Sequence, residues 1–476
     1  MSKLYVFAIG GSGSRVLRSL TMLLAAGVKT DYEIVPMIID PDFSNGDLVR
    51  TVDIMRTYQS IHESLSFNNN EKNEFFKNPI SSLSANGEFL LPLVGTTGIS
   101  FENFINIGTM SLENQAMMRM LFSNANLSSD MNVGFKGNPN IGSIVLNQFV
   151  ESGEFNSFAA NFVNGDKVFI ISSIFGGTGA SGFPLLLKNM RTNNNTALST
   201  APIGAVSLLP YFNLKPNQKS AIQADSFITK AKAALNYYEK NVTGNGTLDD
   251  MYYLGDDFAA AGYDNYDGGG EQQNNAHLVE LLAALSIIDF SQKTPQLSTR
   301  KNTIFHEFGL QNDPQESIVF GDFGQLTINT IRKPLSMFTI LNAYLNNRDV
   351  SHRTSLKWAK DKSAILGDAF WRSNAFITYD MYKKDFETWL NEMNDNHISF
   401  APFRLDKTND DVLDIVVGIS PHYGSLSFLS KKGCDLIDKK LSDNISKISS
   451  NLKPIQAFLE LFYITLKDIC EDKLKL

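Results

Sequence analysis

The stretch KVFIISSIFGGTGASG at residues 167–182 joins an apolar run to a glycine-rich segment, and it decides the fold class. The stretch LYVFAIGGSGS at residues 4–14 repeats the same arrangement. Each pattern is typical of a buried strand, a glycine turn and the start of a helix. Such a turn directs free backbone N–H groups and the positive end of a helix toward an anion. Two such turns predict one ligand with several phosphates, held from two sides.

The segments around these loops predict an α/β fold with a parallel sheet, because strand, glycine loop, helix and strand follow one another over residues 3–39. We expect strands at 3–9, 33–39, 167–174, 203–209, 251–254, 303–310, 317–321 and 411–419. We expect helices at 14–27, 110–122, 144–162, 181–191, 217–240, 276–290, 331–346, 380–394 and 451–472. The alternation becomes irregular after the apolar helix at 276–290, which we take as a central helix. The sequence therefore predicts a nucleotide-binding domain over residues 1–292 and a divergent C-terminal α+β domain over residues 293–476.

The composition is that of an ordinary globular protein, with 43% hydrophobic and 19% charged residues in a chain of 476. A net charge of −8 argues against a general nucleic-acid or anionic membrane surface. The two cysteines, Cys434 and Cys470, have no zinc-type spacing and fit a reducing compartment. We find no signal peptide and no apolar run near the roughly 18 residues that span a bilayer. We therefore expect a cytoplasmic protein.

The first loop also allows a different interpretation, a dinucleotide-binding turn. That fingerprint needs a third glycine after Gly11 and Gly13, and Val16 stands in its place. Asp40, at the end of the second strand, could still hold a ribose. The interpretation would make the chain a dinucleotide-dependent oxidoreductase, and the second glycine loop weakens it.

The second loop, residues 176–182, resembles the signature glycine loop of the tubulin/FtsZ superfamily of GTPases, which has a Gly-Gly-Thr-Gly core followed by small residues. Phe175 and Ser181 depart from that pattern. Further segments match the superfamily in order and extend the resemblance over residues 3–290. They are the turn at residues 10–13, the acidic loop at 40–42, the Gly- and Asn-rich loop at 137–142, the strand end at 252–257 and the helix start at 274–279.

This resemblance implies a divergent bacterial tubulin-like protein that binds GTP or GDP with Mg²⁺ and self-associates into filaments. Asp40 and Asp42 would hold the magnesium ion through water, while Asp256 or Asp257, together with Asn275, would read guanine. Glycines let backbone amides approach phosphate oxygens, which agrees with the implied site. The residues expected at the phosphates are Gly10, Gly11, Ser12, Gly13, Ser14, Gly137, Asn138, Asn140, Gly176, Gly177, Thr178, Gly179 and Ala180.

The segment after the central helix departs from the superfamily. There, an acidic residue enters the nucleotide site of the next subunit and activates water when a filament forms. Asp289 is the nearby acid in this chain, and its register does not fit. Nucleotide binding is therefore better supported than hydrolysis coupled to polymerisation. A non-polymerising, nucleotide-binding scaffold that docks partner proteins remains an alternative. His277, on the apolar helix, is interpreted as a hydrogen-bonded packing residue.

Overall fold

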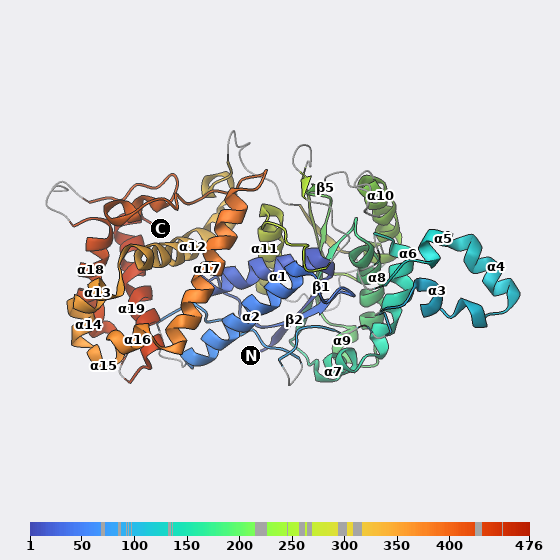
Figure 1. Ribbon diagram of the computed structural model, residues 1–476, viewed down its shortest axis with the longest axis horizontal. Coiled ribbons are helices and arrows are strands. Elements are labelled where there is room, and N and C mark those ends of the chain that lie inside the picture. Colours follow the sequence, from blue (N-terminus) through green and yellow to red (C-terminus); the bar gives the residue numbers. More distant parts are fainter. Residues whose placement is uncertain are drawn as a thin grey trace.

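A six-stranded, all-parallel sheet forms the centre of the molecule, with strand order β2-β1-β3-β4-β6-β8 (Figure 1). The computed structural model describes residues 1–67, 72–83, 87–91, 93, 95–96, 98–131, 135, 137–214, 226–244, 246–256, 262–263, 269–293, 302–307, 317–423, 431–449 and 451–476. The strands are β1 (Lys3–Ile9), β2 (Glu33–Ile39), β3 (Lys167–Ser173), β4 (Ile203–Leu208), β6 (Asp250–Leu254) and β8 (Ile304–Glu307). A separate pair is made by β5 (Asn213–Leu214) and β7 (Gly262–Tyr263).

The central strands are buried and mainly apolar because helices cover both faces of the sheet. Leu4 of β1 aligns with Ile34 of β2 on one side and with Lys167 of β3 on the other. All seven residues of β3 are buried. The parallel α/β sheet and its first five strands confirm the expectation from sequence.

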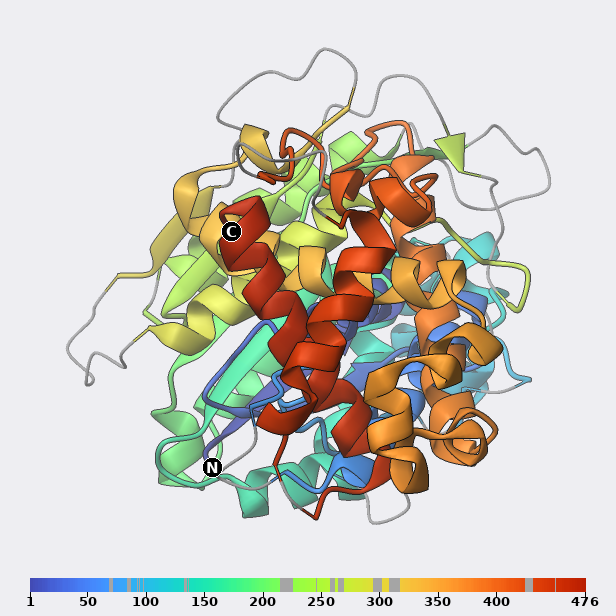
Figure 2. The same ribbon diagram turned by 90° about the vertical axis from the view of Figure 1, so that its left-hand side faces the viewer.

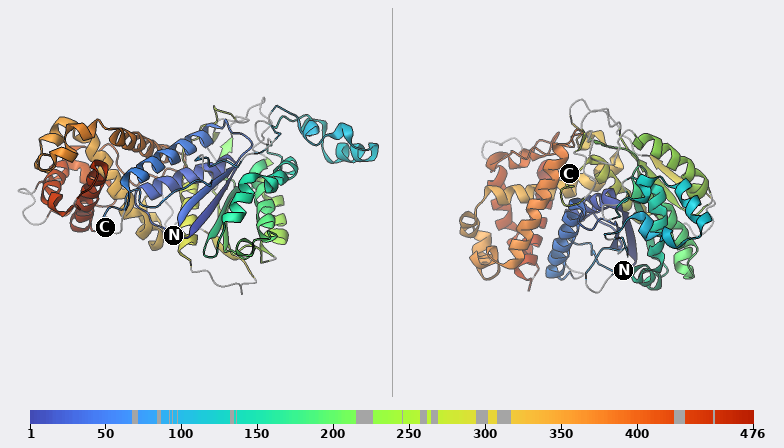
Figure 3. Two further views of the ribbon diagram at one scale, coloured as in Figure 1. Left: turned by 90° about the horizontal axis from the view of Figure 1, so that it is seen from below. Right: turned by 45° about the vertical axis from the view of Figure 1, so that its right-hand side comes forward.

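Helices form a layer on each face of the sheet (Figure 3). One layer contains α1 (Gly10–Ala25), α2 (Gly46–Leu65) and α11 (Leu278–Gln292). The other contains α6 (Pro139–Val145), α7 (Gly153–Asn161), α8 (Gly177–Arg191), α9 (Thr196–Ser199) and α10 (Ser226–Tyr238), with the short helices η2 (Leu146–Glu151) and η3 (Glu239–Thr243). The single helix expected at 144–162 is thus divided, and Ser152 caps α7 by accepting from the amide of Phe155 at 3.1 Å.

The region after the central helix is mostly helical where the structure describes it, and it packs outside α1 and α2 (Figure 2). The Tyr382 hydroxyl donates to the carbonyl of Thr21 at 3.0 Å, and the Trp389 indole donates to the Ser19 hydroxyl at 3.2 Å. The helices are η4 (Phe320–Asp322), α12 (Gln325–Asn347), α13 (Val350–Ser355), α14 (Lys357–Asp361), α15 (Ser363–Leu366), α16 (Asp368–Trp371), α17 (Asn374–Asn394), η5 (Asn409–Ile415), α18 (Gly433–Asn444), η7 (Ile445–Lys447), α19 (Pro454–Ile469) and η8 (Cys470–Leu474).

The three strands expected in this region, at 303–310, 317–321 and 411–419, have different outcomes in the structure. β8 lies within the expected strand at 303–310, but it pairs with β6 and so extends the N-terminal sheet. Ile318 makes one isolated bridge to Phe400, followed by η4. The strand expected at 411–419 is wrong, because residues 409–415 form the 3-10 helix η5, and a short apolar run does not distinguish strand from helix. The boundary between residues 292 and 293 stays a prediction.

A helical arm projects from the body near the sheet (Figures 1 and 3). An isolated antiparallel bridge between Ser100 and Asp130 joins its two ends. α4 has no buried residue, while Phe101 and Leu127 form part of a small core within the arm. Among the described residues, no helix has the length and apolarity to cross a membrane. The arm consists of α3 (Phe101–Phe104), η1 (Ile107–Thr109), α4 (Leu112–Leu121) and α5 (Asn124–Leu127).

Candidate functional site

The first glycine loop is itself the first turn of α1. The helix begins at Gly10, whose φ of +76° favours glycine, rather than at residue 14 as expected. Glycine has a poor helix propensity, which explains why the sequence predicted a start of this helix four residues too far along the chain. A Cβ on Gly13 would lie 2.8 Å from the carbonyl carbon of Ala8, so only glycine lets α1 start this close to β1. Ser14 turns its hydroxyl back to the carbonyl of Gly11 at 2.8 Å.

The second glycine loop starts α8 in the same way. The helix begins at Gly177, four residues before the expected start, and Gly176 precedes it. A Cβ on Gly179 would lie 2.5 Å from the carbonyl oxygen of Ser173, which again requires glycine. Neither α1 nor α8 has a side-chain cap or an acidic residue in its first turn. Both helix N-termini therefore keep backbone donors and a partial positive charge for an anion.

The expected phosphate loops come together at the carboxyl end of the sheet. A Cβ on Gly10 would lie 3.6 Å from Cβ of Thr178, which brings the first two loops into contact. A Cβ on Gly177 would lie 2.9 Å from the amide nitrogen of Asn138 and 3.2 Å from the carbonyl carbon of Gly137. The third loop thus closes on the second, and its role at a phosphate stays a prediction.

Asn138 acts as the N-cap of α6 rather than offering its side chain to a ligand. Its Oδ1 atom accepts from the amides of Asn140 and Ile141 at 3.1 and 3.4 Å. Asn140 is exposed in the first turn of that helix. The backbone of this loop, more than its amide side chains, faces the glycines.

The acidic loop after β2 contains two buried carboxylates. The amide of Asp42 donates to Oδ1 of Asp40 at 3.0 Å. Oδ2 of Asp42 accepts from the amide of Gly269 at 2.7 Å, while its Oδ1 accepts from the Ser44 hydroxyl at 2.8 Å. Burial, with a smaller contribution from the charge of Asp42, raises the pKa of Asp40 to about 7. A cation bound beside the pair would reverse that shift.

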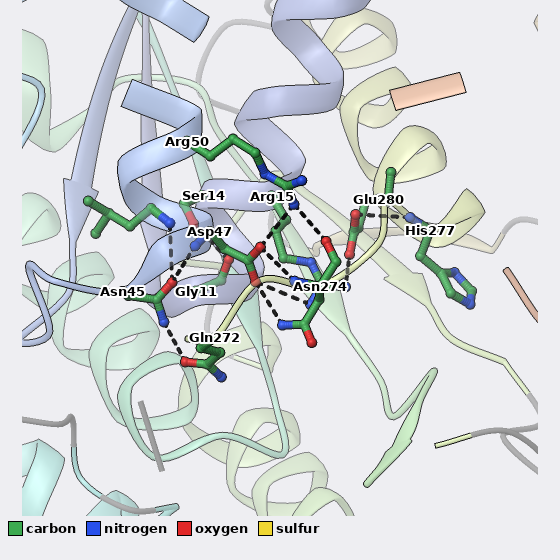
Figure 4. A network of polar contacts seen from close by, with 12 residues as sticks. Gly11, Ser14, Arg15, Asn45, Asp47, Arg50, Gln272, Asn274, His277 and Glu280 are labelled. Atoms are coloured by element: carbon green, nitrogen blue, oxygen red, sulfur yellow. Dashed lines mark hydrogen bonds and ion pairs between the residues drawn. The ribbon is translucent and has the colours of Figure 1, made fainter. Parts of the chain in front are cut away.

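The start of α2 carries a polar network that the sequence did not indicate (Figure 4). Oδ1 of Asn45 caps the helix by accepting from the amide of Asp47 at 2.9 Å, and its Nδ2 donates to Gln272 at 2.5 Å. Asp47 accepts from the backbone and side-chain nitrogens of Asn274 at 3.0 and 2.7 Å. These contacts fix the segment before α11 against the acidic loop. A Cβ on Gly11 would lie 3.7 Å from Nδ2 of Asn45, so the network borders the first glycine loop.

Buried arginines extend this network to the C-terminal helices. Arg15 and Arg18 on α1 are 3% and 2% exposed. Arg15 pairs with Glu280, the third residue of α11, and Arg18 pairs with Glu392 of α17 at 3.0 Å. Glu392 also pairs with Arg50 of α2 at 2.5 Å. Burial lowers the pKa of Arg18, opposed by the charge of Glu392. Two arginines within an otherwise apolar helix are the sequence signal that could have found this cluster.

The N-terminus of α11 is closed by a reciprocal cap. Nδ1 of His277 accepts from the amide of Val279, and Glu280 accepts from the amide of His277, both at 3.1 Å. The Tyr211 hydroxyl donates to Glu280 at 2.9 Å. Burial and the charge of Arg15 lower the pKa of His277 to about 3, so the ring is a neutral acceptor. His277 is thus the hydrogen-bonded packing residue expected.

The residues expected to read the base lie on separate segments. Asn275 is exposed just before α11. Asp256 follows β6 and lines an open cavity of about 460 Å³ between the ends of β4 and β6 and helix α10. Asp257 lies outside the described residues. The assignment of guanine to these side chains stays a prediction.

Asp289 lies on the last turn of α11 and is held within its own chain. It accepts from the Tyr252 hydroxyl at 2.6 Å and pairs with Lys293 at 3.1 Å. It follows the first residue of α11 by 11 positions, so the two are about 16 Å apart along the helix. Asp289 is therefore at the opposite end of the central helix from His277.

Comparison with solved structures finds CetZ proteins. CetZ2 from Haloferax volcanii, a GTPγS-bound protofilament, is 12% identical with a TM-score of 0.30, and the match covers 62% of this chain and 60% of that chain. CetZ from Methanosaeta thermophila strain DSM 6194 is 12% identical with a TM-score of 0.29, over 63% and 57% of the two chains. CetZ1 from Haloferax volcanii, a GDP-bound monomer, is 13% identical with a TM-score of 0.30, over 62% of each chain.

This chain thus spans less than two thirds of the length of each of these proteins. No protein-family model matches the sequence. No curated protein matches it either. A likeness at these scores carries no information on ligand, activity or assembly, so the function has to be argued from the site itself.

Proposed function

We propose that this chain is a tubulin-like protein that binds GTP or GDP with Mg²⁺ and assembles with copies of itself. The observation that carries the proposal is the convergence of three glycine-containing loops at one edge of a parallel sheet. Ligands of such sheets bind beyond the carboxyl ends of the strands. Here two helix N-termini without acidic residues meet at that edge, as a polyphosphate requires.

The acidic loop suits magnesium. Mg²⁺ keeps several waters and binds through one or two carboxylates plus substrate phosphates. Asp40 and Asp42 are buried carboxylates that directly follow β2. Ile39, the last residue of β2, aligns with Ile9, the residue before Gly10, so the carboxylates and the first glycine loop lie at the same edge of the sheet. The bound ion would neutralise phosphate charge, while the backbone amides of the glycine loops orient the phosphates.

The direct test identifies the nucleotide that copurifies with the protein and then titrates GTP and ATP in the presence of Mg²⁺. Gly177→Asp places a carboxylate at the start of α8, where even a Cβ meets the backbone of Asn138 at 2.9 Å. Gly108→Asp is the matched control, since nothing lies within 4 Å of a Cβ at Gly108 in the arm. We expect guanine nucleotide on the wild type and the control, and its loss from Gly177→Asp. Absence of nucleotide binding by the wild type, or equal binding of ATP, would contradict the proposal.

Assembly is the second part of the proposal. Asp289 is tied to Tyr252 and Lys293 at the far end of α11, so it would reach a nucleotide only if that nucleotide belonged to a neighbouring copy. Electron microscopy and light scattering with GTP test this, with Asp289→Asn as the variant. Filaments that persist longer in the variant would support hydrolysis at a subunit contact. A nucleotide-bound protein that stays monodisperse would favour the non-polymerising scaffold.

A further inference from the structure

Lys230, on the second turn of α10, is a cation in the region of the glycine loops that no sequence motif indicated. Its Nζ atom lies 3.0 Å from the point where a Cβ on Gly137 would stand. Gly137 in turn lies beside Gly177, the first residue of α8, because a Cβ on Gly177 would lie 3.2 Å from the carbonyl carbon of Gly137. The ammonium group is therefore close to the junction of the second and third loops.

The packing of α10 on α8 explains this position. The Tyr238 hydroxyl, at the C-terminal end of α10, donates to the carbonyl of Ala180 at 3.2 Å, and its ring packs edge-on against Phe183 at 5.3 Å. Lys230 precedes Tyr238 by eight residues, about 12 Å along the helix. Since Tyr238 sits over the first turns of α8, Lys230 extends past the N-terminus of that helix.

The electrostatics of this position are unfavourable without an anion. Within the described part of the chain, no carboxylate makes an ion pair or hydrogen bond with Lys230. Burial lowers the pKa of Lys230, and no neighbouring charge contributes to the shift. The N-terminus of α8 beside it carries a partial positive charge and has no acidic residue in its first turn. An anion that contacts both groups would stabilise the half-buried ammonium beside a helix N-terminus of the same sign.

We propose that Lys230 binds phosphate oxygens of the nucleotide, between the α8 N-terminus and the loop at Gly137. This inference rests on the proposed function for the identity of the ligand. The chemistry is that of a polyphosphate, because the uncapped N-termini of α1 and α8 lie side by side at Gly10 and Thr178, and Lys230 adds a cation beside Gly137.

The first experiment compares Lys230→Gln with Lys240→Gln, which removes the same charge from an exposed lysine in η3, beyond the other end of α10. Binding of GDP, GTP, guanosine and inorganic pyrophosphate is measured by calorimetry. We expect Lys230→Gln to weaken GDP, GTP and pyrophosphate by about 10- to 100-fold, the effect of losing a hydrogen bond to a charged group. Guanosine binding and the Lys240→Gln variant are expected to be unchanged, and Lys230→Arg should recover most of the affinity.

A second experiment measures the chemical reactivity of the Lys230 amine with and without ligand. Acylation of Lys230, read by mass spectrometry, is expected to be slowed by GDP and by pyrophosphate and to be unaffected by guanosine. Equal binding by Lys230→Gln and Lys240→Gln, with acylation unprotected by any phosphate, would overturn the inference. If pyrophosphate protects Lys230 while GTP and GDP do not bind, the proposed function fails and the anion site stands, so the two failures are distinguishable.

Discussion

Glu392 joins the C-terminal helices to the site, and its replacement by glutamine provides a sharp test of the buried network. On α17, it accepts from Arg18 at 3.0 Å, from Arg50 at 2.5 Å and from the amide of Ala276 at 2.9 Å. Its side chain is 12% exposed and that of Arg18 only 2%. Glu392→Gln keeps the shape and one acceptor oxygen, but it leaves Arg18 without its ion-pair partner and Arg50 with Asp47 alone, at 3.1 Å.

The expected cost follows from the three contacts. A hydrogen bond to a charged group contributes about 1.5–3 kcal/mol, and a neutral one about 0.5–1.5 kcal/mol. Each contact therefore loses about 1 kcal/mol, and the free energy of unfolding falls by about 3 kcal/mol. The same value lies at the lower end of the roughly 3–5 kcal/mol found when one partner of a buried ion pair is removed.

Urea unfolding, followed by circular dichroism and by tryptophan fluorescence, measures this loss. Trp389 lies on the same helix and contacts Ser19, so it reports on the affected layer. A loss of about 3 kcal/mol should lower the midpoint by about 1 M urea for a denaturant slope near 3 kcal/mol/M. Glu88→Gln is the matched control, because its partner Arg56 and Glu88 itself are 48% and 49% exposed and such pairs contribute about 0–1 kcal/mol. Equal midpoints for the two variants would refute the network as a source of stability.

Two further predictions concern α1 and α11. Gly13→Ala should destabilise the protein by about 1–3 kcal/mol, because the new Cβ would lie 2.8 Å from the backbone of Ala8, whereas Gly108→Ala should be neutral in thermal melts. An unchanged melting temperature for Gly13→Ala would contradict the close contact. The pKa of His277 is about 3 in the folded chain against an ordinary value of 6.5, so its contribution to stability is complete above pH 6.5 and is lost as pH falls toward 3. His277→Asn keeps an acceptor for the amide of Val279 but does not titrate. Its urea midpoint should therefore fall less between pH 7 and pH 4.5 than the midpoint of the wild type. Equal decreases for the two proteins would exclude His277 as the titrating group.

The sheet and the glycine loops could be predicted because their signals are local. The mainly apolar run at residues 167–174 is short, rich in β-branched residues and followed directly by glycines, and this combination favours a buried strand and a turn over a helix. The return of β8 to the sheet is not a local property. It depends on pairing between Asp250 and Ile304, residues separated by the whole central helix.

The charged part of the site was missed for a related reason. Arg18, Arg50 and Glu392 belong to three different helices. Arg18 alone carries a sequence signal, its place in a mainly apolar helix, whereas Arg50 and Glu392 look like ordinary surface charges. Lys230 was also missed, since its position depends on how α10 crosses α8 rather than on any motif. Sequence patterns therefore predict glycine loops, whose backbone forms the site, more readily than they predict side chains that converge from separate elements.

The bridge between Ser100 and Asp130 has a consequence for how the chain can change over time. Since the two strands of the arm leave and re-enter the body side by side, residues 101–129 could be replaced by a short turn without altering the spacing of the flanking segments. The elements inside the arm contact mainly one another, so the excised piece would take its own small core with it. The arm is therefore a module whose removal would leave the contacts of the sheet and its glycine loops in place.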